Sequence, residues 1–323
     1  MPHFAIDIFG EWGYNGENSR VEGKMKKVSI CIANFQGRFG DRRALEIARE
    51  IGADAVDFGL GGFDYRKEGN LYAKGEEAIV AYCDGLRRYA EELGIEIFQT
   101  HGRLEGLRNV PDKDAALIEN CRLDCIATAA LGARYCVVHT VTTIYLGADA
   151  PEELMYRLNL ELFRAIVPFA AACGIKVATE TFGDAPRLGC IDFFGDLTHF
   201  KKGYEMIKAD PALRDHVAIC MDTGHSNKST RFVGNPSVGE VIRTLGSDIE
   251  VLHLNDNNTL TDQHKPPMTG SIDWADAMAA LEEIGYSGTY NMEVALGCFG
   301  AAVADHTAAF SIKIMRGLLG LPV

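Results

Sequence analysis

The sequence predicts an α/β protein that folds as a single (β/α)8 barrel with a short N-terminal extension. From Lys27 onward, eight short apolar runs rich in β-branched residues alternate with longer segments of helical period, which is the pattern of repeated βα units. The chain has 323 residues and no Gly/Pro-rich linker, a length that suits one large barrel of about 250 residues with insertions. We therefore expect one domain over residues 27–323.

The expected strands are short enough to be buried members of a parallel sheet. They span Val28–Ala33, Ala55–Gly59, Ile95–His101, Tyr135–Thr140, Ile175–Thr181, Val217–Asp222, Glu250–Leu254 and Thr289–Val294. Apolar residues recur with the period of a helix near residues 39–51, 74–93, 112–131, 151–172, 196–209, 236–245, 273–284 and 302–319. Because one helix follows every strand, a closed barrel is favoured over an open sheet.

Glycines at the joints between helices and strands support this register. Five of them fall just after an expected helix and shortly before the next strand: Gly52, Gly94, Gly132, Gly174 and Gly285. A helix commonly ends in a left-handed residue at this position, and glycine adopts that conformation at the lowest cost.

Residues 1–26 form the predicted N-terminal extension or arm. They include aromatic residues such as Phe9 and Trp12 but also acidic ones such as Asp7, and they lack the apolar core of a secretory signal. An arm of this kind covers either the barrel or a neighbouring subunit, and the sequence leaves both alternatives open.

The composition of the chain limits the classes of partner that the protein is expected to bind. The net charge of −13 disfavours nucleic acid, whose dense negative charge repels an acidic protein. No run approaches the roughly 20 apolar residues that cross a bilayer, so we expect no membrane partner. The nine cysteines include no Cys-x-x-Cys pair, and Cys31, Cys136 and Cys220 lie in apolar runs. A reducing, cytoplasmic location is expected.

Polar side chains gather where the expected strands end, which is where catalytic groups lie in barrels of this kind. Six consecutive strands end in a side chain that can bind a metal: His101, His139, Glu180, Asp222, His253 and Glu293. The loops that follow add His225 and the pair Asp262 and His264. Carboxylate oxygens and imidazole nitrogens suit Mn²⁺, Co²⁺, Zn²⁺ or Mg²⁺.

Taken alone, a histidine or aspartate at a strand end is more often a capping or hydrogen-bonding residue than a ligand. A glutamate that closes a buried strand is different, because its burial is costly unless it is paired or bound to a metal. We therefore expect Glu180 and Glu293 to be ligands, with Asp222 and His253 beside them. The other imidazoles are expected either to orient substrate or to support the ligands: His101, His139, His225 and His264.

Four segments resemble one superfamily. They are Asp222-Thr223-Gly224-His225, His253-Leu254-Asn255-Asp256, the Gly-containing stretch from Pro267 to Trp274, and Asn291-Met292-Glu293. The chain from Lys27 onward resembles the sugar phosphate isomerase/epimerase superfamily, the xylose-isomerase-like TIM barrels that include ketose 3-epimerases, inositol-catabolism enzymes and endonuclease IV.

The resemblance implies an enzyme that isomerises or epimerises a small sugar, sugar phosphate or inositol-derived keto compound. It implies one divalent ion held by Glu180, Asp222, His253 and Glu293, with both glutamates exchanging protons with substrate through a metal-stabilised enediolate. Residues implied to bind substrate or support the ligands are His101, His139, His225, Asp256, Asp262 and His264. The resemblance departs at Pro186 and Thr259, where ketose 3-epimerases carry Glu and Arg.

Two alternatives stay open at this stage. One is a trinuclear zinc phosphodiesterase like endonuclease IV, whose ligand types are matched by nine residues: His101, His139, Glu180, Asp222, His225, His253, Asp262, His264 and Glu293. The other is a non-catalytic barrel that binds a small molecule. The acidic charge favours the isomerase, with a sugar-like substrate as partner. The sequence leaves open whether several identical subunits assemble.

Overall fold

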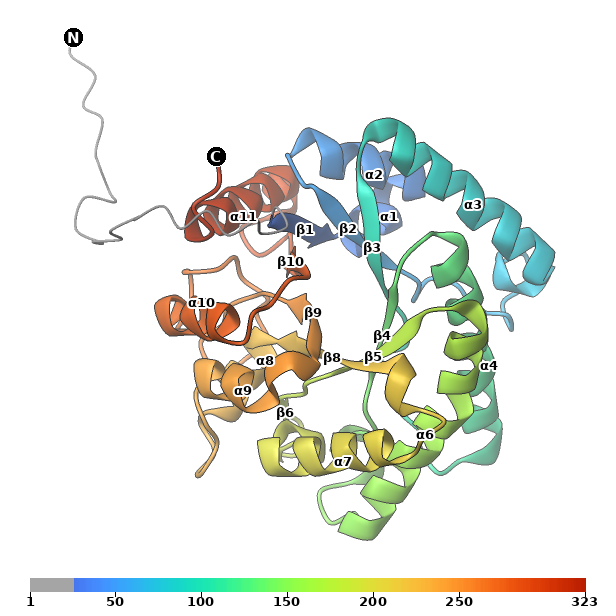
Figure 1. Ribbon diagram of the computed structural model, residues 1–323, viewed down its shortest axis with the longest axis vertical. Helices are drawn as coiled ribbons and strands as arrows, with labels where there is room; N and C mark the ends of the chain where they lie inside the picture. The colour runs from blue at the N-terminus through green and yellow to red at the C-terminus, as the bar shows by residue number, and fades with distance from the viewer. Residues whose placement is uncertain (1–25) are drawn as a thin grey trace.

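The computed structural model describes residues 26–323, so the predicted arm lies outside the described residues except for Lys26. Eight parallel strands surround a central axis and helices cover the outside (Figure 1). The barrel strands are β1 (Lys27–Cys31), β2 (Ala55–Gly59), β3 (Glu96–His101), β4 (Tyr135–His139), β5 (Lys176–Glu180), β8 (Val217–Asp222), β9 (Ile249–His253) and β10 (Thr289–Met292). The (β/α)8 prediction is confirmed.

The first and last strands are neighbours. The order in the sheet is β10-β1-β2-β3-β4-β5-β8-β9, and β1 pairs with β10 from Lys27 opposite Thr289 to Ile30 opposite Met292. The remaining gap between β9 and β10 is joined just beyond the end of β9. There the amide of Leu254 donates to the carbonyl of Asn291 at 2.8 Å, and the amide of Glu293 donates to the carbonyl of Leu254 at 3.1 Å. These bonds close the ring.

The eight expected helices are present with small shifts at their ends. They are α2 (Asp41–Glu50), α3 (Glu76–Leu93), α4 (Pro111–Ala130), α6 (Glu152–Cys173), α7 (Leu197–Ala209), α9 (Val238–Leu245), α10 (Trp274–Glu283) and α11 (Ala304–Leu318). All five glycines expected at the joints have a positive φ, between 67° and 87°. The left-handed helix ends are therefore confirmed.

Several short elements were not predicted. Strand β1 ends at Cys31, because α1 (Ala33–Phe39) begins where the sequence predicted strand to continue to Ala33. The loops after β4 and β8 contain α5 (Thr143–Leu146) and α8 (Thr223–Ser229). The hairpin of β6 (Asp184–Ala185) and β7 (Cys190–Ile191) follows β5. All of these elements lie on the side of the barrel where the strands end.

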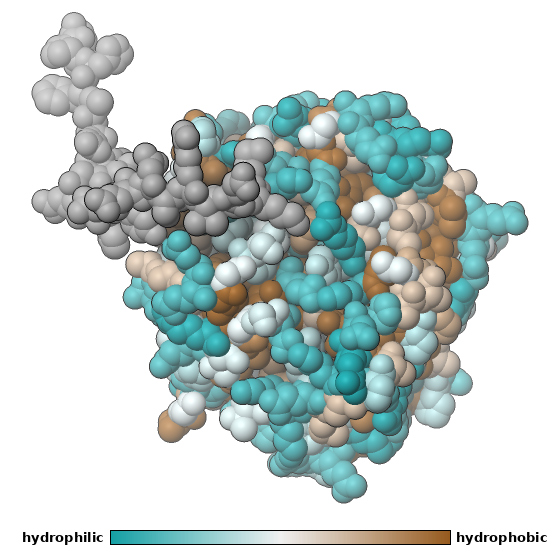
Figure 2. Space-filling view, in the orientation of Figure 1, coloured by the Kyte–Doolittle hydropathy of each residue, from teal (hydrophilic) through white to brown (hydrophobic). Residues whose placement is uncertain are grey.

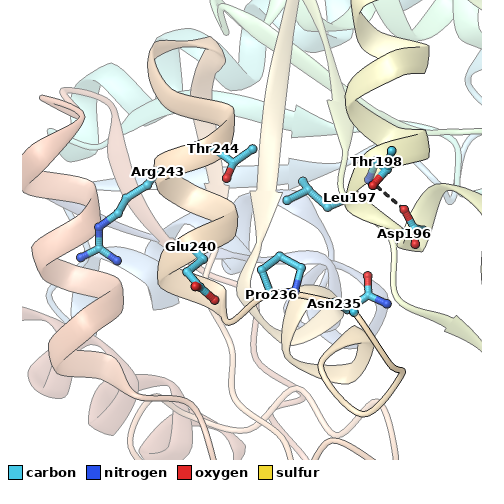
Figure 3. Close-up of a pocket in the computed structure, with 9 residues that line it drawn as sticks. Asp196, Leu197, Thr198, Asn235, Pro236, Glu240, Arg243 and Thr244 are labelled. Carbon is cyan, nitrogen blue, oxygen red and sulfur yellow. Dashed lines mark hydrogen bonds between the residues drawn. The ribbon is translucent and has the colours of Figure 1, made fainter.

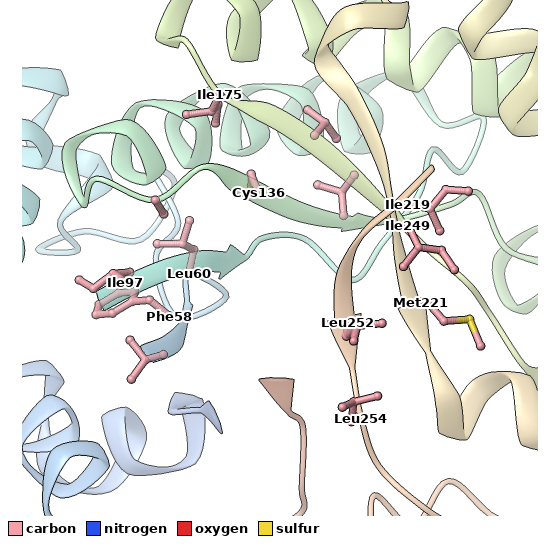
Figure 4. Packing of buried hydrophobic residues seen from close by; sticks show 14 of the residues in the cluster. Phe58, Leu60, Ile97, Cys136, Ile175, Ile219, Met221, Ile249, Leu252 and Leu254 are labelled. Carbon is pink, nitrogen blue, oxygen red and sulfur yellow. The ribbon is translucent and has the colours of Figure 1, made fainter. Parts of the chain in front are cut away.

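The core has two compartments. Between the strands and the helices lies a large apolar cluster, to which strand residues such as Ile97, Ile219 and Leu252 belong (Figure 4). Alternate residues point inward, and β4, β5, β8 and β9 fill their half of the interior with the second cluster: Val137, Ala178, Ala218, Cys220 and Val251. The other half is polar, because β1, β2, β3 and β10 contribute the buried side chains Ser29, Asp57, Gln99 and Asn291.

The outer surface is mainly hydrophilic on the face seen in Figure 2, with smaller hydrophobic areas between the hydrophilic residues. Among residues 26–323, no helix is both long enough and apolar enough to pass through a bilayer.

Candidate metal centre at the carboxyl ends of the strands

Four side chains meet at one point of the rim. Glu180 is the last residue of β5, Asp222 the last of β8, His253 the last of β9, and Glu293 comes directly after β10. Each offers one ligand atom, and these four atoms all lie within 4.8 Å of one another. The structure therefore brings together the four residues that the sequence predicted as ligands.

Glu180 is the deepest member of this group. Its side chain is 1% exposed, and neither carboxylate oxygen accepts a hydrogen bond. Nδ1 of His253 and Oε2 of Glu293 are also buried without a hydrogen-bond partner. Leaving such atoms unpaired costs about 1–3 kcal/mol each, and more for a charged group. A divalent cation among them would satisfy all of these atoms at once, so the donor set fits a metal ion.

Asp222 is held in place from both sides. Its Oδ1 caps the N-terminus of α8 by accepting from the amide of His225 at 2.6 Å, and its Oδ2 accepts from Nδ2 of Asn255 at 2.9 Å. Burial raises the pKa of Asp222 to about 6, although the neighbouring His225 opposes this effect. Each oxygen keeps a second lone pair, so the carboxylate can still ligate a cation.

The electrostatic environment keeps the glutamates ionised. Burial acts to raise the pKa of Glu180, but the imidazoles of His253 and His139 outweigh it and hold this pKa well below the usual range. Burial is likewise outweighed at Glu293, where His253 lowers the carboxyl pKa. Both glutamates are therefore carboxylates near neutral pH, the form that binds metal and accepts protons.

Two further imidazoles lie beside the glutamates. Nε2 of His101 is 3.5 Å from Oε2 of Glu180 and 3.6 Å from Oε1 of Glu293. Nε2 of His139 is 3.1 Å from Oε2 of Glu180. The ring of His101 also stacks on that of His253, with centroids 5.1 Å apart. Both histidines thus lie where a molecule bound at the four ligands would contact them.

A second group lies next to the first. Oδ2 of Asp262 is 3.6 Å from Nε2 of His225 and 3.3 Å from Nε2 of His264, and these three residues also offer ligand atoms within 4.8 Å of one another. His225 belongs to α8, not to a turn as the sequence suggested. The buried ammonium of Lys228 is 3.7 Å from Oδ1 of Asp262 and 2.7 Å from Asp184.

Asp256 faces away from this cluster and holds a loop. Its carboxylate accepts hydrogen bonds from the indole of Trp274 and from four backbone amides, those of residues 257, 270, 271 and 272. The structure therefore places Asp256 among backbone donors, and not beside the four ligands. It fixes the loop between His264 and α10.

One residue of the centre was missed by the sequence analysis. Asp57, on β2, is fully buried, and its Oδ2 lies 3.1 Å from Nε2 of His253. The sequence pattern did not indicate it, because it lies in the middle of its strand, whereas the predicted ligands lie at strand ends. The available signal was an aspartate inside the apolar run from Ala55 to Phe58, where a carboxylate is costly unless it is paired.

A surface hollow between α7 and α9 is separate from this centre (Figure 3). It is lined by Asp196, Leu197, Thr198, Gly234, Asn235, Pro236, Glu240, Arg243 and Thr244. None of these is a predicted site residue, and the lining contains no imidazole. The metal-binding chemistry of the described residues is thus concentrated at the strand ends.

Comparisons with known proteins agree with the fold. D-psicose 3-epimerase of Ruminiclostridium cellulolyticum is 26% identical over 160 residues, which cover 50% of this chain and 46% of that protein. The match thus spans about half the length of this relative. Among solved structures, a D-tagatose 3-epimerase-like protein has a TM-score of 0.68 at 20% identity, covering 91% of this chain and 97% of that one.

The IolI protein, solved with a zinc atom, has a TM-score of 0.66 at 18% identity and covers 91% of this chain and 96% of its own. At such identities, these two structures are evidence for the fold alone. A family model described as the xylose isomerase-like TIM barrel matches residues 45–313, which is most of the chain. The chain therefore belongs to the xylose isomerase-like TIM barrel family.

Proposed function

We propose that this protein is a divalent-metal-dependent isomerase or epimerase of a small sugar, sugar phosphate or inositol-derived keto compound. The observation that carries the proposal is the pair of glutamates, Glu180 and Glu293, which approach one cation site from β5 and from the end of β10 with buried, unpaired oxygens. The epimerase name of the sequence relative supports the same class of reaction.

The two glutamates would move the proton. One carboxylate removes the proton from the carbon next to the substrate carbonyl, and the other, after taking a proton from solvent, donates that proton to a carbon of the substrate. Their ionised state at neutral pH suits the first step. A bound divalent cation would supply Lewis-acid stabilisation of the negative charge that develops on the carbonyl oxygen. Mn²⁺, Co²⁺, Zn²⁺ and Mg²⁺ all accept these ligands.

The imidazoles would orient the substrate. His101 lies between the two glutamates, and His139 lies beside Glu180, so hydroxyl groups of a sugar held there would find donors and acceptors on both sides. Pro186 and Thr259 lack the charged groups that ketose 3-epimerases carry. The substrate therefore cannot be held at Pro186 and Thr259 by the charged contacts that hold a ketohexose in those epimerases, and it needs a different contact there.

Solvent-isotope exchange tests the proposed reaction. The protein, loaded with Mn²⁺ or Co²⁺, is incubated in deuterium oxide with a panel of ketoses, sugar phosphates, keto acids and inosose-like compounds. Deuterium should appear next to the carbonyl of the substrate that is converted. Conversion without deuterium would replace the two-glutamate mechanism with a hydride shift, and no exchange or conversion across the panel would overturn the proposed function.

The group formed by His225, Asp262 and His264 favours a second candidate, a trinuclear zinc phosphodiesterase, since it could hold a further ion. Two observations weigh against it. The ammonium of Lys228, 3.7 Å from Asp262, already supplies positive charge there. The net charge of −13 opposes binding to nucleic acid. A metal count on the purified protein separates the two, because one ion per chain supports the isomerase and three support the phosphodiesterase.

A further inference from the structure

Asp57 occupies an unusual place for a carboxylate. It lies in the middle of β2, its side chain points into the barrel, and it is fully buried. Among the ion pairs of residues 26–323, its only partner is His253. No lysine or arginine of the described chain forms an ion pair with it, so its charge is compensated by hydrogen bonds and by this one imidazole.

Three nitrogen atoms converge on a single oxygen of Asp57. Oδ2 faces Nε2 of Gln99 at 3.1 Å, Nδ2 of Asn291 at 3.4 Å and Nε2 of His253 at 3.1 Å. The amide of Asn291 is itself oriented, because its oxygen accepts from the hydroxyl of Ser29 at 3.0 Å. The surroundings of Asp57 therefore require an acceptor at this position, and the carboxylate provides it.

The opposite edge of the His253 ring faces the metal ligands. Nδ1 lies 3.2 Å from Oε1 of Glu180 and 3.2 Å from Oε2 of Glu293. Imidazole binds a metal through an unprotonated nitrogen, and in the neutral ring the other nitrogen then carries the proton. A carboxylate at Nε2 selects the ring form whose free lone pair is on Nδ1.

We propose that Asp57 is a positioning residue that holds His253 with its proton on Nε2 and so presents Nδ1 to the cation. This inference rests on the metal centre of the proposed function, but it does not depend on which substrate is used. It gives a reason for a buried carboxylate in the polar half of the barrel interior, on a strand that β1 separates from the nearest strand that ends at one of the four ligands.

Metal affinity is the first test. In Asp57→Asn the side chain keeps its size but loses its charge, and the amide can turn a donor toward His253. The affinity for Zn²⁺, measured by competition with a chromophoric chelator, should fall about 10–100-fold. Ser29→Ala is the matched control, because it alters the same buried network without touching His253, and its affinity should stay within about threefold of wild type. Equal affinity of Asp57→Asn and wild type would overturn the proposal.

Nitrogen NMR on the wild-type protein is the second test and needs no variant. In the Zn²⁺-loaded protein, the ring of His253 should show a protonated Nε2 and a metal-bound Nδ1. Coordination through Nε2 would contradict the proposal even if Asp57→Asn fails to fold. The proposed function is tested separately. If His253 has this protonation pattern but no substrate takes up deuterium, the positioning role of Asp57 stands and the isomerase activity is excluded.

Discussion

Glu180 and Glu293 differ in their access to solvent. The side chain of Glu180 is 1% exposed, whereas that of Glu293 is 17% exposed. Glu180 thus forms the floor of the site, and Glu293 lies nearer to its mouth. Because water reaches only one of them readily, we expect Glu293 to exchange its proton with solvent faster than Glu180.

Replacing either glutamate tests its role in proton transfer. Glu180→Gln and Glu293→Gln keep the size and a ligating oxygen but cannot accept the proton, so turnover should fall by about 10²–10⁴-fold at saturating Mn²⁺. Steady-state kinetics and metal content are measured on the same samples. Glu161→Gln, an exposed change on α6, is the control. Near-wild-type turnover in both variants with metal bound would remove the catalytic assignment.

Asp222→Asn and His253→Ala test the ligand set. Loss of one of four ligands should lower bound metal sharply in both variants. Asparagine caps helices as well as aspartate does, so Asp222→Asn should retain α8 and isolate the loss of charge. Metal per chain is measured by mass spectrometry after dialysis. An unchanged ratio in both variants would show that the cation lies elsewhere.

Most residues of the candidate site could be predicted individually from the sequence, because they lie at strand ends. Glu180, Asp222 and His253 each lie within one residue of the end of a predicted strand, and parallel strands of a barrel end at one rim. Asp57 could not be found this way. Its role depends on which strand lies opposite His253 across the barrel interior. The distance of 3.1 Å between Oδ2 of Asp57 and Nε2 of His253 results from closure of the ring and cannot be read from sequence spacing.

Among the elements, the loop between β9 and α10 depends on one carboxylate. Asp256→Asn replaces an acceptor of five donors by a group that itself donates, so the free energy of unfolding should drop by about 1–3 kcal/mol. Hydrogen exchange should rise in residues 265–272, with metal content unchanged. Thermal denaturation and exchange mass spectrometry measure both effects. A raised KM without a loss of stability would instead support contact between Asp256 and substrate.

The long elements followed from periodicity, whereas the short ones did not. Helix α8 has the sequence Thr-Gly-His-Ser-Asn-Lys-Ser, which contains few residues that favour a helix. It forms because Asp222 caps it and because all seven residues are buried by tertiary packing. Strands β6 and β7 have two residues each, too few to show alternation.

For the whole molecule, the charge of −13 leads to a prediction about nucleic acid. A duplex with an abasic site should not form a specific complex at physiological salt, for which a dissociation constant near 10⁻⁸ M or tighter is typical. Fluorescence anisotropy measures binding, and gel electrophoresis detects strand cleavage. Tight, salt-sensitive binding with incision would favour the trinuclear phosphodiesterase over the isomerase.

Metal removal should weaken the entire barrel. The four ligands come from β5, β8, β9 and the end of β10, so a bound cation links both sides of the junction where β9 meets β10. A ligand that binds only the folded state at 100 times its dissociation constant adds about 2.7 kcal/mol. Thermal unfolding with and without a chelator measures this effect, and identical midpoints would contradict a cation held by these four residues.

Closure of the ring by its first and last strands also has a consequence for biosynthesis. β1 pairs with β10, and Glu293 follows β10 directly. Until the ribosome has made β10, β1 lacks one of its neighbours. At that point Glu180, Asp222 and His253 have been synthesised, but Glu293 has not. A cation held by all four ligands can therefore bind only after β10 has been synthesised.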